Sequence, residues 1–197
     1  MSRWMTSQWM NVAAWCAALC CIAAVVLGGM ALEGYSHALY PLALPGARGV
    51  PAALAFNLVG FVVPGLLAAV VAHGLYRRLP ARAGWLARIG ARMLLLSALA
   101  FAAQGLLPLD PMNLDARASG LHASAWMIWW IAFAAGAPLL AVGMREVRAI
   151  TSAAVIVLLA MMLIPAAVLE PPIAQRIALA TWLLWLALTP WLATRNQ

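Results

Sequence analysis

The chain has 197 residues, of which 66% are hydrophobic and only 9% are charged, and its formal net charge is +7 at pH 7. A soluble domain has about 45–50% apolar and about 25% charged residues, so this composition excludes a water-soluble globular fold. It also excludes disordered, collagen-like and disulfide-scaffold chains, because the sequence is strongly apolar, lacks a glycine period and has only three cysteines.

Six apolar runs follow one another along the chain, and each is long enough to cross a hydrocarbon core, which takes about 20 residues as a helix. We place them at 9–30, 54–76, 87–108, 122–143, 149–169 and 173–193. The apolar part of the first run is longer than the core of a signal peptide, so we interpret it as a retained helix. Because exposed strands cannot face lipid and no alternating pattern is present, the sequence predicts an all-α, polytopic membrane protein. Residues 1–197 then form a single domain, a bundle of six transmembrane helices.

The arginines predict how this bundle is oriented. With a cytoplasmic N-terminus, nine of the 12 arginines lie on the cytoplasmic side, as the positive-inside rule favours. The three outside are Arg48, Arg117 and Arg176. Both termini are then cytoplasmic. Because the arginines gather at segment ends rather than along one exposed face, we expect no nucleic-acid partner.

Carboxylates follow the three outward-running helices at Glu33, Asp110 and Glu170. A negative charge at a helix C-terminus is disfavoured by about 0.3–1 kcal/mol, so we expect nearby cations to compensate. The candidates are Arg48, Arg117, Arg176, His37 and His122. One interpretation is that these are interface residues forming ion pairs, and the other is that they belong to a functional site.

Polar residues gather at the predicted outer end of the bundle. Because polar groups at membrane depth are costly and usually face the bundle interior or a wet cavity, we predict an outward-opening pocket. Its predicted lining is Glu33, Ser36, His37, Asn57, Gln104, Ser119 and Trp126. The alternative for Asn57 and Gln104 is that they join helices through hydrogen bonds of about 0.6 kcal/mol each.

The predicted catalytic residues are Asp110 and His122, an acid and a histidine close to the same membrane surface. Together they could serve as orienting group and general base, with Ser119 or Ser36 as nucleophile. No Gly-x-Ser-x-Gly elbow supports this chemistry. A zinc site with His37 and His122 ranks lower, because no characteristic ligand spacing is present.

We expect no cofactor and no metal. A haem with two histidine ligands is disfavoured because His73 and His122 lie at opposite ends of a core about 30 Å thick. The three cysteines, Cys16, Cys20 and Cys21, fall within the first apolar run and are interpreted as packing residues.

Several short motifs resemble a known family. They are Gly34-Tyr35-Ser36, Phe56-Asn57-Leu58-Val59-Gly60, Gly105-Leu106-Leu107-Pro108-Leu109-Asp110-Pro111 and Gly120-Leu121-His122. In this order they resemble the domain-of-unknown-function 998 (DUF-998) family of six-helix bacterial and archaeal membrane proteins, which looks distantly related to Frag1/DRAM/Sfk1-like proteins. The resemblance implies a six-helix topology and a role around lipids, with Asn57, Asp110 and His122 at the matching positions.

Together these observations predict a bacterial inner-membrane protein whose polar pocket opens to the periplasm and binds or processes a lipid or another amphiphile. Membrane lipids are the expected partners, and the sequence leaves open whether the protein is an enzyme. One alternative is a small transporter or permease that uses kinks at Pro64-Gly65 and Pro138. Against it, no ionisable residue lies at mid-membrane. A further alternative is a structural or assembly subunit of a membrane complex.

Overall fold

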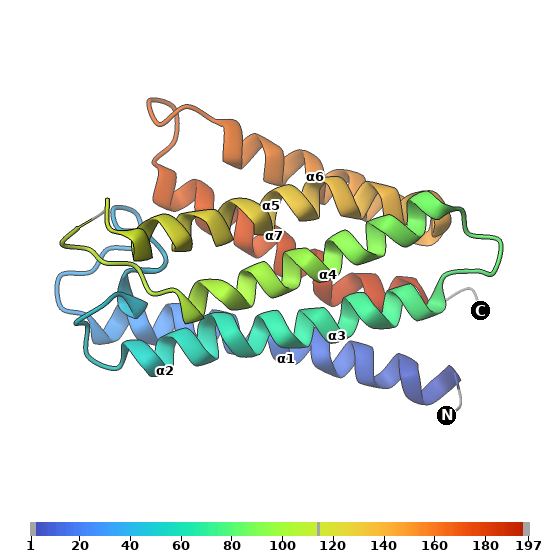
Figure 1. Cartoon of the computed structure of the whole chain (residues 1–197), viewed down its shortest axis with the longest axis horizontal. Helices are drawn as coiled ribbons and strands as arrows, with labels where there is room; N and C mark the ends of the chain where they lie inside the picture. The colour runs from blue at the N-terminus through green and yellow to red at the C-terminus, as the bar shows by residue number, and fades with distance from the viewer. Residues whose placement is uncertain (1–2, 114, 195–197) are drawn as a thin grey trace.

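The structure is a computed structural model that describes residues 3–113 and 115–194 (Figure 1). All its regular elements in these residues are helical. They are α1 (Arg3–Ala31), η1 (Leu44–Gly46), α2 (Ala53–Asn57), η2 (Leu58–Val62), α3 (Val63–Arg78), α4 (Trp85–Leu106), α5 (Arg117–Gly143), η3 (Arg145–Val147), α6 (Arg148–Leu163) and α7 (Pro171–Leu192). The described residues contain six helical spans that are long and apolar enough to cross a membrane, with α2, η2 and α3 forming one of them. The predicted all-α, multi-pass membrane fold is confirmed.

Successive spans run antiparallel to each other, so their connections alternate between the two ends of the molecule, at the left and right of Figure 1. One end holds the start of α1, the end of α7 and the connections around 79–84 and η3. We call it the basic end. The other holds the connections 32–52, 107–116 and 164–170, and we call it the acidic end because Glu33, Asp110, Asp115 and Glu170 lie there. Which face of the membrane each end meets stays a prediction.

Small residues let the helices approach closely, most of all between α4 and α5. A Cβ atom added to Gly90 of α4 would lie 2.3 Å from the backbone nitrogen of Leu140 and 2.6 Å from the carbonyl oxygen of Gly136, both on α5. A Cβ atom added to Gly65 of α3 would lie 2.5 Å from the backbone nitrogen of Ala102 on α4. Lipid supplies no hydrophobic force between helices, so this close packing holds the bundle together.

Large aromatic side chains fill the interior around these contacts. The buried set is Phe56, Phe61, Phe101, Trp129, Phe133, Trp182 and Trp185. Phe101 joins three helices, because its ring centroid lies 5.6 Å from that of Trp129 on α5 and 4.7 Å from that of Trp182 on α7. A void beside Trp182 and Trp185 has a volume of only about 10 Å³, which leaves room for at most one water molecule.

Two helix boundaries differ from the sequence prediction at the connection between α6 and α7. The α6 helix ends at Leu163 rather than near 169, because Ile164 precedes Pro165 and is extended, with ψ 132°. Glu170 is therefore the N-cap of α7, and its carbonyl accepts the backbone N–H groups of Ile173 and Ala174. The prediction that Glu170 follows a helix C-terminus was wrong. Its charge lies where the helix dipole favours an anion.

The second span contains a π-helical turn, η2, directly before Pro64. A proline has no N–H to donate to the previous turn, so a wider turn at this point keeps the helix continuous. The predicted fourth helix also begins earlier than expected, at Arg117 rather than 122. Its first turn lies against the 107–116 connection and brings Ser119 and His122 to the acidic end.

Candidate functional site

His122, a predicted catalytic residue, lies buried on α5 and faces the end of α4. Its Nδ1 donates to the carbonyl oxygens of Gln104 at 3.2 Å and Leu107 at 2.9 Å. These carbonyls lie at the C-terminal end of α4, where few backbone donors are left: Gln104 also accepts the N–H of the C-cap residue Leu107, at 3.4 Å. His122 therefore caps α4, and only Nε2 is left for acid–base chemistry.

Asp110, the other predicted catalytic residue, lies in the 107–116 connection. Its carboxylate accepts the backbone N–H of Met112 at 3.1 Å, which forms a local turn. Its backbone N–H meets the hydroxyl oxygen of Ser119 at 3.2 Å, and that hydroxyl lies 3.0 Å from the carbonyl of Asn113. Within the described residues no hydrogen bond joins the Asp110 carboxylate to His122. Asp110 and Ser119 shape the loop in front of the histidine.

Asn57 and Gln104 are both buried, and they differ in their partners. The Asn57 amide donates to the carbonyl of Gly46 at 2.8 Å, so it ties η1 to the second span. Gln104 is fully buried, and neither its amide nitrogen nor its amide oxygen has a partner in the described part of the chain. Asn57 thus links two backbone segments. No hydrogen bond in the described residues accounts for the burial of the Gln104 amide.

The other predicted pocket residues are spread over the acidic end. Glu33 is exposed, and the Ser36 hydroxyl accepts the backbone N–H of Ala38 at 3.3 Å. Trp126 is half-buried, with its ring centroid 4.8 Å from that of Trp129. His37 is the one member of the predicted set that lines a groove between α1 and α7.

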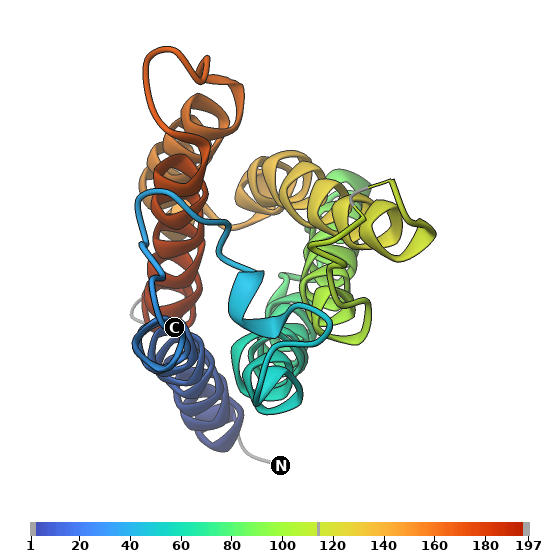
Figure 2. The same cartoon turned by 90° about the vertical axis from the view of Figure 1, so that its left-hand side faces the viewer.

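This α1–α7 groove has a volume of about 430 Å³, which is within the range of about 300–1,000 Å³ typical of small-molecule sites. Figure 2 shows α1 and α7 side by side, with the 32–52 connection crossing their acidic end. The lining is Trp15, Ala18, Cys21, Ile22, Val25, Val26, His37, Leu42, Arg176, Leu179, Ala180, Leu183, Leu184 and Ala187. It is almost entirely apolar, and its two polar side chains, His37 and Arg176, come from the acidic end.

Arg176 is held in place at the end of the groove by neutral oxygens. One guanidinium nitrogen, Nη1, donates to the carbonyls of Tyr40 at 3.1 Å and Pro172 at 2.8 Å, and Nη2 donates to the Tyr35 hydroxyl. The Nε–H is buried and has no acceptor in the described residues. We expected a carboxylate beside this arginine, but none of those described lies within 4.0 Å of its guanidinium. Within the part of the chain that the structure describes, its direct partners are therefore all neutral.

Tyr35 does not supply the missing negative charge. Burial raises the pKa of its hydroxyl above the usual value, while the nearby guanidinium of Arg176 acts in the opposite direction. The hydroxyl stays protonated at neutral pH and donates to the carbonyl of Pro41 at 3.2 Å. Tyr35 also packs against His37, with ring centroids 5.1 Å apart. The guanidinium of Arg176 is therefore surrounded by the neutral Tyr35 hydroxyl and by backbone carbonyls.

Neither the groove nor a role for Tyr35 was predicted from the sequence, and Arg176 was expected only to pair with a carboxylate. The sequence did contain a sign that Arg176 is unusual. It lies one helical turn after Pro172 and is the one charged residue of α7. The described residues also contain no group of three or more His, Cys, Asp or Glu side chains that could hold a metal ion.

Comparison of the chain with protein-family models, curated proteins and solved structures finds no match. The resemblance to the DUF-998 family stays a prediction.

Proposed function

We propose that the protein binds a membrane lipid with an anionic headgroup, with the hydrocarbon chain in the α1–α7 groove and the headgroup at Arg176. The observation that carries this proposal is an apolar groove that ends at a guanidinium with no carboxylate within 4.0 Å among the described residues. A hydrocarbon chain fits the lining, and a phosphate or carboxylate fits the arginine.

The position of the groove supports a ligand that comes from the bilayer. Trp15, Ile22, Val26 and Leu184 line it and are also exposed large hydrophobics, so the groove opens sideways toward lipid. The 32–52 connection covers its acidic end through Leu42, which is buried. A lipid could therefore enter laterally and keep its headgroup at the membrane surface.

With the orientation predicted from the arginines, the headgroup site faces the periplasm and the protein is an inner-membrane protein. The pocket differs from the one expected from the sequence in its lining, since its polar side chains are His37 and Arg176 rather than Asn57, Gln104 and Ser119. The proposal concerns binding, and it needs no reactive group in the groove.

Photo-cross-linking tests this proposal. The protein is reconstituted with phosphatidylglycerol or phosphatidylcholine that carries a diazirine in one acyl chain, and the cross-linked peptides are mapped by mass spectrometry. We expect cross-links in the stretches 15–26 of α1 and 179–187 of α7, with phosphatidylglycerol preferred. One arginine near the surface contributes about 1 kcal/mol toward an anionic lipid, so Arg176→Gln is expected to reduce this preference about fivefold.

Two matched controls separate the groove from the general membrane surface. Arg117→Gln removes an exposed arginine at the same end and is expected to keep the preference. Ala180→Trp fills the groove and should lower cross-linking of both lipids, whereas Ala135→Trp, at an exposed position on α5, should not. Cross-links spread evenly over all lipid-facing helices, or an unchanged preference in Arg176→Gln, would rule out the proposal.

A further inference from the structure

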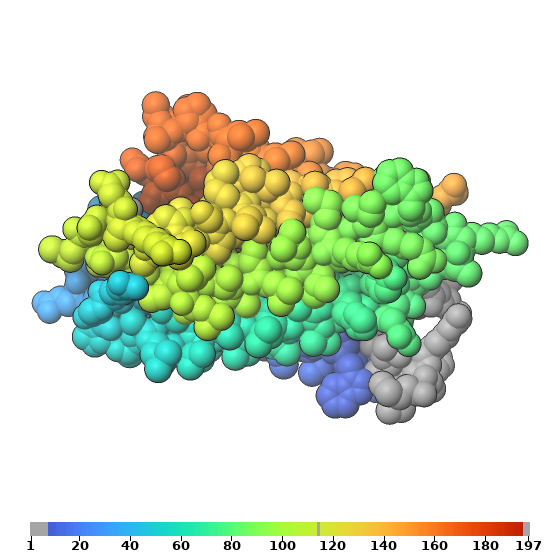
Figure 3. Space-filling model, viewed as in Figure 1, coloured from blue at the N-terminus to red at the C-terminus, as the bar shows by residue number. Residues whose placement is uncertain are grey.

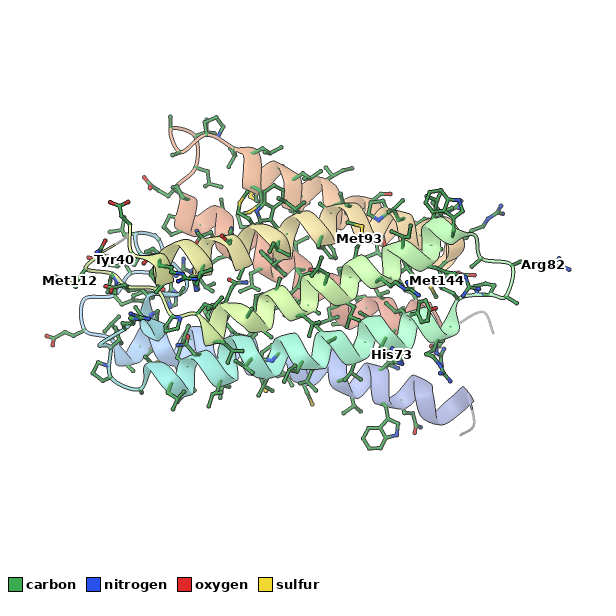
Figure 4. All side chains as sticks on the ribbon, in the orientation of Figure 1. Tyr40, His73, Arg82, Met93, Met112 and Met144 are labelled. Carbon is green, nitrogen blue, oxygen red and sulfur yellow. The ribbon has the colours of Figure 1, made fainter. Side chains whose placement is uncertain are left out.

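A second, smaller groove lies at the basic end, between α3 and α4. Its volume is about 150 Å³, and its lining is Ala72, His73, Tyr76, Ala91, Arg92 and Leu95. In Figure 3 these two helices form much of the face toward the viewer, and Figure 4 labels His73 on α3 in the same half of the molecule as Arg82. The buried Ala72 and Ala91 form the floor, while His73 and Arg92 are exposed at its sides.

Two arginines of α4 converge on one tyrosine of α3 at this groove. The guanidinium carbon of Arg92 lies 5.7 Å from the centroid of the Tyr76 ring. Arg88 lies one helical turn before Arg92 on α4, so its guanidinium adds positive charge near Tyr76. The two arginines therefore place positive charge beside the Tyr76 side chain. Because like charges one turn apart on a helix repel each other, this arrangement favours binding of an anion between them.

No carboxylate among the described residues compensates Arg88 or Arg92. Four of the five acidic residues, Glu33, Asp110, Asp115 and Glu170, lie at the acidic end, and only Glu146 belongs to the basic end. Basic pockets between membrane helices are sites where anionic lipid headgroups bind. The charge of this groove is therefore complementary to a phosphate.

The surroundings of the groove indicate that the phosphate belongs to a lipid. Leu95 lies one turn deeper than Arg92 along α4 and extends the groove toward the hydrocarbon core. Val70, Ile89 and Leu96 are exposed large hydrophobics on the same two helices. A free anion would leave this apolar part empty, whereas an acyl chain would cover it.

We propose that the α3–α4 groove is a second lipid site, in which Arg88, Arg92 and Tyr76 bind the phosphate of an anionic phospholipid from the leaflet at the basic end. It shares no residue with the α1–α7 groove and lies at the opposite end of the bundle. The two proposed sites can therefore be tested independently of each other.

Native mass spectrometry of the detergent-solubilised protein tests this site. The Arg176→Gln variant serves as background, so that the first site does not obscure the second. We expect this variant to keep an adduct with phosphatidylglycerol that phosphatidylcholine does not give. Adding Arg88→Gln and Arg92→Gln is expected to weaken the adduct about fivefold for each arginine removed. Adding Arg145→Gln, an exposed arginine at the same end, is expected to leave it unchanged.

Leu95→Trp, which fills the apolar part of the groove, should also weaken the adduct while both arginines remain. This variant keeps the test decisive if the double arginine variant fails to fold. An adduct unaffected by any of these changes would overturn the proposal. So would complete displacement of phosphatidylglycerol by millimolar inorganic phosphate, because the acyl chain would then contribute nothing.

Discussion

His122 donates one N–H to two carbonyls of the last turn of α4, and this contact joins α4 to α5 at the acidic end. A polar side chain at membrane depth has either a catalytic role or a structural one, in which it hydrogen-bonds backbone groups that have no other partner. The geometry here gives the second role directly, since the carbonyls of Gln104 and Leu107 have few other donors. The role is structural whether or not Nε2 takes part in chemistry.

We predict that His122→Ala lowers the free energy of unfolding by about 1–3 kcal/mol, because buried carbonyls lose their donor. His122→Asn should recover part of this loss, since the asparagine amide lies close to the position of Nδ1. SDS titration of the protein in mild detergent, followed by circular dichroism, gives both values. A His122→Ala variant as stable as the wild type would show that the cap contributes nothing.

Tyr35 offers a test of the arginine site that depends on pH. Its pKa is raised by burial, so the folded state holds the hydroxyl proton more tightly than the unfolded state, whose tyrosines titrate near pH 10. The resulting contribution to stability is fully present below pH 10 and is lost as pH rises through the raised pKa of the folded state.

We predict that the tyrosinate absorbance of Tyr35, obtained as the difference between wild type and Tyr35→Phe, develops above pH 10. Arg176→Gln is expected to shift it higher still, because it removes the one nearby cation that lowers this pKa. The measurement is a spectrophotometric titration in detergent. A titration of Tyr35 below pH 10 would contradict the half-buried, neutral hydroxyl described beside Arg176.

At the scale of the helices, the pair α4 and α5 depends on glycine at the crossing point. The backbone atoms of Leu140 and Gly136 leave no room for a Cβ atom on Gly90, and backbone cannot move aside as a flexible side chain can. Gly120, on the first turns of α5, has no heavy atom within 4 Å of an added Cβ. The two glycines form a matched pair.

We therefore predict that Gly90→Val lowers the free energy of unfolding by at least about 2 kcal/mol. The folded yield and the midpoint temperature of thermal unfolding should fall with it. Gly120→Val should change the stability by no more than the roughly 1 kcal/mol range of helix propensities. Thermal unfolding monitored by size-exclusion chromatography in detergent compares them. Equal midpoints for the two variants would mean that α4 and α5 are not packed as described.

The helices could be predicted from the sequence because each span is a long apolar run, and in lipid such a run has no other stable structure. Their ends were harder to place. Pro165 ended α6 earlier than the apolar composition indicated, and Glu170 changed from a C-terminal to an N-terminal residue as a result. Composition identifies a span, while local backbone restrictions set its limits.

The candidate groove could not be predicted in the same way. It forms because the first and last helices, α1 and α7, lie side by side and the 32–52 connection folds over them, which no local pattern indicates. Asn57 and His122, two of the buried polar residues of the spans, bind backbone carbonyls, whereas the Gln104 amide has no partner in the described residues. For Asn57 and His122, polarity at membrane depth therefore indicated a backbone hydrogen bond rather than a pocket.

At the scale of the whole molecule, the charges are divided between the two ends. By sequence, nine of the 12 arginines fall on the segments of the basic end, and four of the five acidic residues fall on those of the acidic end. The positive-inside rule then predicts that the basic end is cytoplasmic. In that orientation the lipid proposed for the α1–α7 groove would come from the outer leaflet, and the lipid proposed for the α3–α4 groove would come from the inner leaflet.

Cysteine labelling tests this orientation. The three native cysteines lie on α1 and are first replaced by alanine, after which Asp115→Cys and Arg82→Cys place single thiols at exposed positions of the two ends. We predict that a membrane-impermeant maleimide labels Asp115→Cys in intact spheroplasts and labels Arg82→Cys only after permeabilisation. The opposite pattern would invert the leaflets from which both lipids come, but it would leave the two grooves and their arginines unchanged. Orientation and lipid binding are therefore independent claims, and each has its own measurement.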